Sequence, residues 1–487
     1  MCQDPLTDNR QLSETTMPEL IDTELLILGG GPGGYAAAFL AADHGMQVTL
    51  IEARDRPGGT CLHVGCIPSK AVLHAAKLIT DAREAEHIGL SFAAPKIDIN
   101  GVRGHWQKVV DTLSKNLVGL SRVRKVNLVQ GLGRFVDGQT VEVEGGQRYR
   151  FQKCIIATGS SPTIPPALNI SSPRLMDSTR ALQLEEVPRR LLVIGGGYIG
   201  LEMGYVYAAL GSQVTVVEMT DGLLPGVDRD LVKPLHDRLL RNKLFHEILL
   251  KARVAKLEEV AGGLRAVLET PDGKQTEQTF ERVLIAVGRR PNSKDIGLEK
   301  AGVQVDSKGF IEVDPQRRTT APNILAIGDV AGEPMLAHKA TYEGKIAVEV
   351  LMGEPSVYDV RAVPAVVFTD PEIAWCGLTE TDAIKTNKPH KVLKFPWSWS
   401  GRAMTLGRTE GLTKLIVDPE TERVLGVGIV GVDAGEMLGE AMLAIEMSAS
   451  ARDVAMTMHA HPTLLETIGE AAEAFYGTSV HAVPAKK

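Results

Sequence analysis

The sequence has little cysteine and no long run of basic residues. Five cysteines occur among 487 residues, an odd and low number that fits a reducing cytosol better than a disulfide-stapled secreted protein. The net charge is −7, which gives nucleic-acid binding little support. The first 24 residues hold six acids and one base, unlike an arginine-rich transit peptide, and they contain no apolar signal-peptide core. We therefore expect a cytoplasmic protein whose residues 1–20 form a flexible acidic tail.

The sequence also lacks a convincing membrane span. Residues 25–42 are uncharged for 18 positions, which nominally reaches transmembrane length. Five of these residues are glycine and one is proline, and an internal repeat explains the stretch better. We expect no membrane span.

Two segments, 25–55 and 191–221, repeat each other at an offset of 166 residues, with 13 of 31 positions identical. Each segment predicts an apolar strand, a glycine turn, a helix and a β-branched strand that ends in glutamate, Glu52 or Glu218. The glycines follow the G-x-G-x-x-G spacing in both copies: Gly29, Gly31 and Gly34, then Gly195, Gly197 and Gly200.

This spacing is typical of dinucleotide binding. The first glycine permits a tight turn, the second lets a pyrophosphate approach the backbone, and the third lets helix and strand pack closely. The helix N-terminus then offers N–H groups to the phosphates. Two such sites indicate electron transfer between two dinucleotides, one of them a flavin. Glu218 favours the free 2′-hydroxyl of NAD, because a carboxylate repels the 2′-phosphate of NADP and no Arg occupies positions 219–220.

Other segments divide the chain, whose length predicts about three or four domains. Residues 154–162 and 283–292, the second including Gly288, each close a nucleotide-binding unit. Residues 323–330 predict a buried strand ending at Asp329, which either holds a polyol hydroxyl or forms a simple turn. We expect an α/β fold with two Rossmann-like nucleotide-binding domains and a C-terminal α+β dimerisation domain. The expected domains are 21–160 for FAD, 161–288 for NAD, 289–360 as a central domain completing the FAD site, and 361–487 for the dimer interface.

The chemistry centres on "GGTCLHVGCIPSK", residues 58–70. In a regular helix the Cα atoms of Cys61 and Cys66 lie roughly 8–9 Å apart, whereas a disulfide needs about 4.4–6.8 Å. A bond between them therefore requires a distorted helix, which Gly65 and Pro68 make plausible, and such a bond is readily reduced. Two unrelated buried thiols are an alternative. A metal site with His63 is another, but no second Cys/His cluster completes it, so we expect no metal.

Three further side chains are candidates for acid–base or electrostatic roles. Lys70 either lowers a thiolate pKa and stabilises a reduced flavin, or is a solvated helix lysine. In "HAHPTLLE" the residue spacing does not rank His459 against His461 as a base. Pro462 predicts a helix start, which would place Glu466 in the first turns, near an imidazole whose basicity it raises.

Together these motifs resemble the disulfide-reducing flavoproteins of the glutathione-reductase class, and within it the dihydrolipoamide dehydrogenases. The resemblance runs from about residue 23 to the C-terminus and is carried by "GGGPGGY", "GGTCLHVGCIPSK", "ATGS", "GGGYIGLE", "AVGRRPN", "AIGDV", "MLAHKA" and "HAHPTLLE". One departure is His63, where the family usually has Asn; we expect it to shift the dithiol potential without abolishing the chemistry.

The resemblance implies a role for each site residue. Cys61 faces the substrate and Cys66 the flavin, while His461, oriented by Glu466, is the acid–base catalyst and completes the active site of the partner subunit. Lys70 lies beside the flavin and pairs with Glu202. The residues implied for FAD are Gly29, Gly31, Gly34, Glu52, Lys70, Gly133, Asp329 and Ala337, and those for NAD are Gly195, Gly197, Gly200, Glu202, Glu218 and Gly288.

The implied function is reoxidation of protein-bound dihydrolipoamide in a 2-oxo-acid dehydrogenase or glycine cleavage complex, through the disulfide and FAD, with reduction of NAD⁺ to NADH. The implied partners are a second copy of the chain and a lipoyl-bearing acyltransferase. One alternative is a glutathione-reductase type of FAD-dependent disulfide reductase, which predicts an Arg-lined NADP pocket that positions 218–220 lack. Another is a flavoprotein that docks on a complex and has weak activity.

Overall fold

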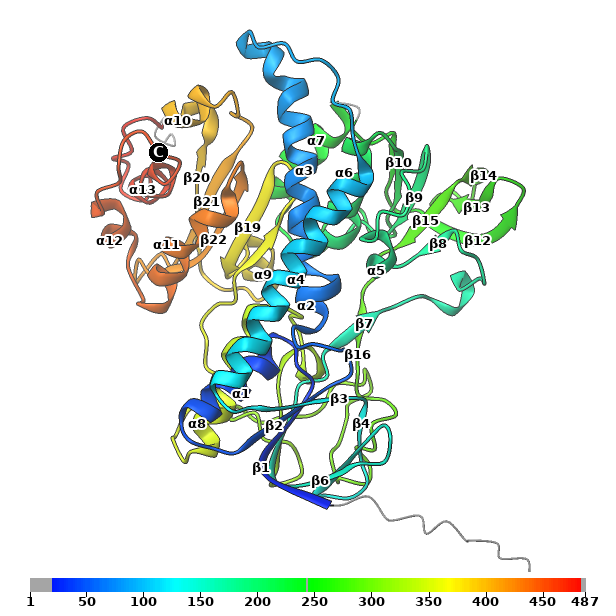
Figure 1. Cartoon of the computed structure of the whole chain (residues 1–487). Coiled ribbons are helices and arrows are strands. Elements are labelled where there is room, and N and C mark those ends of the chain that lie inside the picture. The colour runs from blue at the N-terminus through cyan, green and yellow to red at the C-terminus, as the bar shows by residue number, and fades with distance from the viewer. Residues whose placement is uncertain (1–19, 242–243, 483–487) are drawn as a thin grey trace, which may run out of the picture. The chain divides into compact units, whose positions relative to one another are not determined.

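The computed structural model describes residues 20–241 and 244–482, which form two compact units (Figure 1). Unit 1 contains the described residues up to Pro57, Val118–Thr158 and Ser293–Ser356. Unit 2 contains Gly58–Leu117, Gly159–Asn292 and the described residues from Val357 onward. The expected acidic tail lies outside the described residues, except for Leu20, which begins the first strand.

Unit 1 is built on a doubly wound sheet. Its parallel strands are β3 (Asn127–Gln130), β2 (Val48–Glu52), β1 (Leu20–Leu28), β6 (Arg148–Ile156) and β17 (Ile324–Ala326). Two antiparallel strands, β5 (Thr140–Val143) and β4 (Gly133–Phe135), extend it beyond β6. The centre of β1 is an apolar run because helices and loops bury both faces of a parallel strand.

Two helices of unit 1 pack closely through glycine. They are α1 (Pro32–Asp43), which follows the first glycine loop, and α8 (Ala337–Leu351). A Cβ on Gly33 would lie 2.8 Å from the carbonyl oxygen of Ala340, and one on Gly344 would lie 2.8 Å from that of Gly33. The glycines therefore let the two helix backbones touch.

Unit 2 contains a second parallel sheet with the strand order β11-β10-β9-β15-β8. Helix α6 (Tyr198–Leu210) connects β9 to β10, and α7 (Arg229–Arg241) precedes β11. An antiparallel sheet, β12-β13-β14, inserts before β15. The strands are β8 (Leu175–Met176), β9 (Arg190–Ile194), β10 (Gln213–Val217), β11 (Glu247–Leu249), β12 (Arg253–Val260), β13 (Gly263–Glu269), β14 (Gln275–Phe280) and β15 (Arg282–Ile285).

The C-terminal part of unit 2 is an antiparallel sheet in the order β18-β19-β22-β21-β20. Helices α11 (Ala434–Glu446), α12 (Ala451–Met456) and α13 (Glu466–Glu473) lie beside it (Figure 1). The strands are β18 (Ala365–Val367), β19 (Glu372–Gly377), β20 (Lys391–Pro396), β21 (Leu412–Val417) and β22 (Val424–Gly431). The α+β character expected after Val360 is therefore present.

The cysteine motif opens a long helix that packs on α6. Helix α2 (Gly59–Val64) is followed by α3 (Cys66–Glu84), and α4 (Ile99–Val123) comes next in the chain. Thr80 and Tyr205 share a hydroxyl hydrogen bond of 2.7 Å, and Arg83 donates to the carbonyl of Ala209. These bonds hold α3 against the helix that starts at the second glycine loop.

Among the described residues, no helix combines the length and apolar character that crossing a membrane requires.

Candidate active site

The first glycine of each G-x-G-x-x-G loop is required by its backbone. Gly29 and Gly195 both have φ of +108°, a left-handed value that glycine adopts without a Cβ penalty. A Cβ would also lie 2.3 Å from the carbonyl oxygen of Ala157 in the first loop and 2.4 Å from that of Ala286 in the second. Each loop is therefore pressed against the strand end that the sequence predicted to close its nucleotide-binding unit.

The other loop glycines differ in what surrounds them. A Cβ on Gly34 would lie 1.8 Å from the Gly29 oxygen, and one on Gly200 would lie 2.1 Å from the Gly195 oxygen. No heavy atom of the described chain lies within 4 Å of a Cβ placed on Gly197. Since α1 and α6 begin after glycines, which have no capping side chain, their N-terminal N–H groups stay available. This cradle fits a pyrophosphate.

The two loop glutamates are fixed in the same way. In each loop, one carboxylate oxygen accepts a hydrogen bond from the backbone N–H of the glycine that lies between the first two glycines of the G-x-G-x-x-G pattern. The other oxygen accepts from the backbone N–H of the residue two positions after the glutamate. The distances are 2.8 Å (Gly30) and 2.9 Å (Arg54) for Glu52, and 2.7 Å for both Gly196 and Thr220 with Glu218. Each carboxylate oxygen retains a lone pair for a ribose hydroxyl.

The cysteine pair lies across a helix break. Helix α2 ends at Val64 and α3 begins at Cys66, with Gly65 between them. A Cβ on Gly65 would lie 2.9 Å from the carbonyl oxygen of Thr60, so this position has no room for a side chain. The interruption matches the distortion that a Cys61–Cys66 bond requires. Both residues are thiols in this structure.

The two thiols differ in their electrostatics. The hydrogen bond that Cys61 donates to Cys66 lowers the pKa of the Cys66 thiol to about 7, with burial opposing it and the charge of Lys70 assisting. The same bond, together with burial, raises the pKa of the Cys61 thiol far above its usual value. Of the two thiols, Cys66 is therefore the one that ionises more readily.

This asymmetry predicts the pH dependence of alkylation. In the reduced protein, the rate at which iodoacetamide modifies Cys66 should rise through a midpoint of about pH 7. Removing the donor in Cys61→Ala should move that midpoint upward, toward the ordinary cysteine value of about 8.5. Peptide mass spectrometry across a pH series measures both midpoints. The same midpoint in both proteins would show that the S–H···S bond does not set the acidity of Cys66.

Lys70 ties the cysteine helix to a buried carboxylate. Its Nζ lies 3.1 Å from Glu202 Oε2 and 4.2 Å from the ring centroid of Phe368. Glu202 is 3% exposed and also accepts the backbone N–H of Phe368 at 3.0 Å. The carboxylate of Glu202, which we expected among the nucleotide contacts, is thus engaged by Lys70 and Phe368. Phe368 was missed in the sequence because no motif marks it.

The two histidines of "HAHP" lie in different surroundings. His459 Nε2 lies 2.8 Å from Glu440 Oε1, and this side chain is only 10% exposed. His461 Nδ1 lies 2.8 Å from Glu466 Oε1, and this side chain is 76% exposed. Only His461 offers a ring nitrogen, Nε2, to an incoming molecule, so the geometry favours it as a base.

Hydrogen bonds to the Glu466 carboxylate favour its ionised form beside His461. Burial opposes ionisation, but hydrogen bonds from His461 and from the backbone N–H of Thr463, the latter at 2.7 Å, keep the pKa of Glu466 below its usual value. Glu466 is the first residue of α13. The prediction of a helix start at Pro462 was wrong, because residues 464–465 form a turn before α13 and the Glu466 carboxylate accepts the N–H of Thr463 ahead of it.

Unit 1 presents the remaining expected flavin residues. Asp329 lies in a 3-10 turn (Gly328–Ala331), Ala337 is the first residue of α8, and Gly133 begins β4. Behind the turn, the fully buried Glu343 accepts the N–H of Gly328 at 2.6 Å. It also pairs with Arg317 at 2.9 Å and Lys339 at 3.0 Å. The i, i+4 spacing of Lys339 and Glu343 was a visible signal for this anchor, whereas Arg317 left none.

The last of the residues expected to contact NAD is Gly288. Gly288, which follows β15, has φ of +126°, and no heavy atom of the described chain lies within 4 Å of an added Cβ. An added side chain would therefore meet open space at this position.

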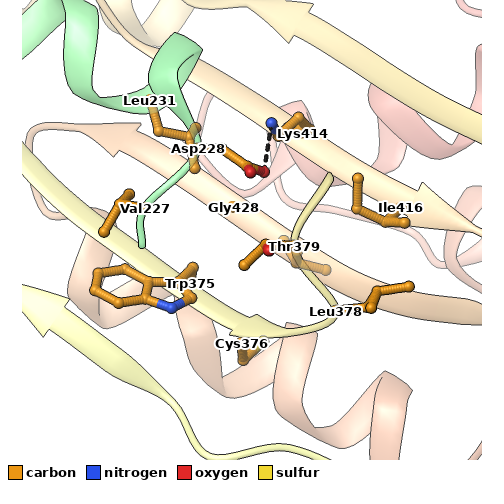
Figure 2. A pocket seen from close by; sticks show the side chains of 11 residues that line it. Val227, Asp228, Leu231, Trp375, Cys376, Leu378, Thr379, Lys414, Ile416 and Gly428 are labelled. Carbon is orange, nitrogen blue, oxygen red and sulfur yellow. Dashed lines mark ion pairs between the residues drawn. The ribbon is translucent and has the colours of Figure 1, made fainter. Parts of the chain in front are cut away.

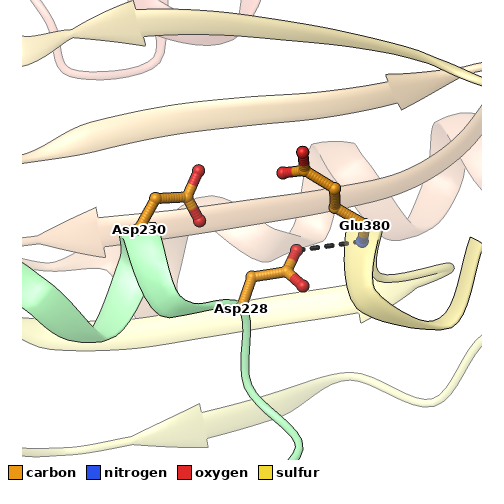
Figure 3. Close-up of side chains that lie close together, drawn as sticks. All are labelled: Asp228, Asp230 and Glu380. Carbon is orange, nitrogen blue, oxygen red and sulfur yellow. Dashed lines mark hydrogen bonds between the residues drawn. The ribbon is translucent and has the colours of Figure 1, made fainter. Parts of the chain in front are cut away.

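Three carboxylates of unit 2 are close enough to hold a metal ion. Oxygens of Asp228, Asp230 and Glu380 lie within 4.8 Å of one another (Figure 3). Lys414, 1% exposed, lies 2.7 Å from Asp228 and Asp230 and 3.0 Å from Glu380, beside a small pocket (Figure 2). Lys394 adds a second cation 2.7 Å from Asp230. These ammonium groups offset the carboxylates, so we interpret the cluster as a structural tie.

If the cluster is a structural tie, replacing its two lysines should lower the free energy of unfolding by very different amounts. Lys414→Met should lower the free energy of unfolding by about 3–5 kcal/mol, because it leaves the buried carboxylate of Asp228 without its cationic partner. Lys394→Met is the matched control; its side chain is 41% exposed, so a loss below about 1 kcal/mol is expected. Urea unfolding of both variants measures the difference. Equal losses would contradict the assignment of Lys414 as the central cation.

Comparison with known proteins places the chain in a family. Residues 23–344 match the model of the pyridine nucleotide-disulphide oxidoreductases, and residues 363–472 match the dimerisation domain of the same family. The dihydrolipoyl dehydrogenase of Vibrio cholerae is 45% identical over 95% of this chain and 97% of its own length. That of Haemophilus influenzae is 46% identical over 95% of this chain and 97% of its own length.

Solved structures agree with this assignment. LpdA from Mycobacterium tuberculosis superposes with a TM-score of 0.85 at 29% identity, covering 93% of this chain and 99% of LpdA. The HOCl-induced flavoprotein disulfide reductase RclA from Escherichia coli gives 0.82 at 29% identity, covering 92% and 99%. The chain, with its two glycine loops, its cysteine pair and its C-terminal sheet domain, belongs to the pyridine nucleotide-disulphide oxidoreductase family.

Proposed function

We propose that this chain oxidises protein-bound dihydrolipoamide with NAD⁺, as a homodimer that serves a lipoyl-bearing acyltransferase of a 2-oxo-acid dehydrogenase or glycine cleavage complex. The observation that carries the proposal is the pair of cysteine thiols across the helix break, in which Cys61 is hydrogen-bonded to Cys66. The identity of about 45% to dihydrolipoyl dehydrogenases along nearly the whole chain supports the substrate. The dimerisation domain supports the homodimer.

The first half of the proposed reaction is a dithiol–disulfide exchange. His461 takes the proton from one substrate thiol, and the resulting thiolate attacks Cys61 in the oxidised Cys61–Cys66 disulfide. Cys66 leaves as a thiolate, which its low pKa and the charge of Lys70 favour, since more acidic thiols leave faster. The second substrate thiol then displaces Cys61, whose sulfur takes up the proton that this thiol loses. Lipoamide departs, and the protein holds both cysteines in the reduced state.

The second half returns the electron pair to NAD⁺. When bound, FAD supplies the two-electron acceptor between the thiols and the nicotinamide. The first loop, with Glu52, Gly133, Asp329 and Ala337, is proposed to hold FAD, and the second loop, with Glu218 and Gly288, to hold NAD⁺. The dithiol closes again to a disulfide, NADH forms, and one proton passes to solvent through His461.

The preference for NAD⁺ rests on Glu218. This carboxylate is 8% exposed and fixed by two backbone N–H groups, so it is positioned to accept from a 2′-hydroxyl and to repel a 2′-phosphate. Glu218→Gln should therefore lower the ratio of kcat/KM for NAD⁺ over NADP⁺ by about 10-fold or more. Glu299→Gln, at an exposed position, is the control and should leave the ratio unchanged. An unchanged ratio in Glu218→Gln would contradict this role.

A comparison of four substrate pairs tests the proposal. The purified yellow protein is assayed with dihydrolipoamide and either NAD⁺ or NADP⁺, then with glutathione disulfide and either NADH or NADPH. We expect turnover with dihydrolipoamide and NAD⁺ to exceed the other three by at least about 100-fold. Turnover confined to glutathione disulfide and NADPH would overturn the proposal in favour of a glutathione-reductase type of activity. Tight binding to an acyltransferase core with negligible turnover would favour a docking flavoprotein.

A further inference from the structure

Unit 2 contains a cavity of about 210 Å³ to which the proposed reaction gives no role. Its wall includes Met219, the residue that directly follows Glu218, so the cavity lies next to the carboxylate proposed to receive the ribose of NAD⁺. The rest of the wall comes from residues 251–253, where β12 begins, and from the end of β13 and the turn that follows it. Ligand pockets usually measure about 300–1,000 Å³, so this cavity can take one end of a nucleotide but not all of it.

Backbone hydrogen bonds hold the start of β12 against the segment that carries Glu218. The N–H of Ala252 donates to the carbonyl oxygen of Glu218 at 3.0 Å, and the N–H of Lys251 donates to that of Thr220 at 2.8 Å. The N–H of Glu218 donates in turn to the carbonyl oxygen of Leu249 at 2.8 Å. The sequence has no cation at positions 219–220, but the fold places Lys251 directly beside them.

Two cations line the cavity, and they differ in their partners. Glu269 holds the guanidinium of Arg253 at 2.6 Å, so the charge of this arginine is already offset. Lys251 is exposed, and within the part of the chain that the structure describes no carboxylate lies within ion-pair distance of its ammonium group. An anionic group that enters the cavity is therefore attracted by Lys251 and repelled by Glu218.

We propose that Lys251 is a specificity-determining residue of the second nucleotide site: its ammonium group attracts the 2′-phosphate of NADP⁺, and the preference for NAD⁺ results from Glu218 acting against it. This inference rests on the proposed function, in which Glu218 receives the adenosine ribose of NAD⁺. A phosphate monoester carries a charge of about −1.5 to −2 at neutral pH, whereas a 2′-hydroxyl is neutral. Lys251 therefore favours NADP⁺ and has little effect on NAD⁺.

Removing the charge of Lys251 should increase the preference for NAD⁺. In Lys251→Met, kcat/KM for NADP⁺ should fall by about three- to fivefold, the value of a solvent-exposed ion pair, while kcat/KM for NAD⁺ should change by less than about twofold. Lys251→Arg retains the charge and should keep the wild-type ratio. Lys256→Met removes another exposed lysine of β12 and should leave both values unchanged. An equal loss with both nucleotides in Lys251→Met would overturn the inference.

The binding of two nucleotide fragments separates this inference from the proposed function, because it requires no turnover. Calorimetry on the full-length holoprotein compares adenosine 2′,5′-bisphosphate, which has the 2′-phosphate, with AMP, which lacks it. The affinity for the bisphosphate relative to AMP should be about three- to fivefold higher in Glu218→Gln, where the opposing carboxylate is removed, than in the double variant that also carries Lys251→Met.

Two results of the calorimetry would overturn the role of Lys251: equal affinity ratios in the single and the double variant, or no binding of the bisphosphate to Glu218→Gln. Absence of NAD⁺-linked dihydrolipoamide oxidation in the wild type would overturn the proposed function instead.

Discussion

Replacing Cys66 with serine is expected to lower kcat for NAD⁺-linked oxidation of dihydrolipoamide by at least about 1000-fold. A serine oxygen cannot form the disulfide with Cys61, so the protein has no bond that the substrate dithiol can reduce. The loss does not depend on folding, because the helix break at Gly65 and the Lys70–Glu202 pair do not involve the Cys66 sulfur. Steady-state formation of NADH measures it.

Cys376→Ala provides the matched control for Cys66→Ser. This cysteine is 1% exposed in β19 and lies outside the proposed site, so its removal should leave kcat within about twofold of the wild type. Cys61→Ser should lose as much activity as Cys66→Ser, because either substitution prevents the disulfide. Retention of more than a tenth of the wild-type kcat by Cys66→Ser would exclude the exchange mechanism.

Replacing His461 with glutamine should lower kcat for the same reaction by about 10²- to 10⁴-fold, the range expected when a general base is removed. Glutamine retains a polar group near Glu466 but cannot accept a proton from the substrate thiol. The loss should shrink as the pH rises, because the substrate then ionises without help. Measuring kcat from neutral to alkaline pH tests both the size of the loss and its trend.

Two further variants provide comparisons for the loss of kcat in His461→Gln. Glu466→Gln should cause a smaller loss, because the base is retained and only its orientation and basicity change. His44→Gln replaces an exposed histidine after α1 and should behave as the wild type. A His461→Gln enzyme as active as His44→Gln would show that the base lies elsewhere, and His459 would then be the first residue to test.

The parts of the fold that the sequence predicts best are local. Gly29 and Gly195 follow from their spacing because the left-handed turn at each depends on one residue and its neighbours. The helix break between Cys61 and Cys66 follows from Gly65 in the same way. The start of α13 does not follow from the sequence in this way. Pro462 favours a helix start, but α13 begins only at Glu466, whose carboxylate accepts the backbone N–H of Thr463.

Contacts between distant segments escape the sequence. Lys414 lies 184 residues from Asp230 along the chain, and nothing in "LTKLIVD" distinguishes a buried lysine from a surface one. The assignment of residues 293–356 to unit 1 also depends on a contact between distant segments, the pairing of β17 with β6. Residue spacing alone likewise leaves His459 and His461 unranked. The family resemblance implied His461, and the exposure of the two side chains, which depends on the packing of α13 and α11, favours the same residue.

The redox state of the Cys61–Cys66 peptide during a single turnover tests the central claim most directly. The oxidised holoprotein is mixed anaerobically with one equivalent of dihydrolipoamide, then with NAD⁺, and samples are acid-quenched, alkylated and analysed by mass spectrometry. We predict that the peptide changes from disulfide-linked to doubly alkylated before NAD⁺ is added, and returns to the disulfide as one equivalent of NADH forms. NADH formation from a peptide that stays disulfide-linked throughout would contradict the account.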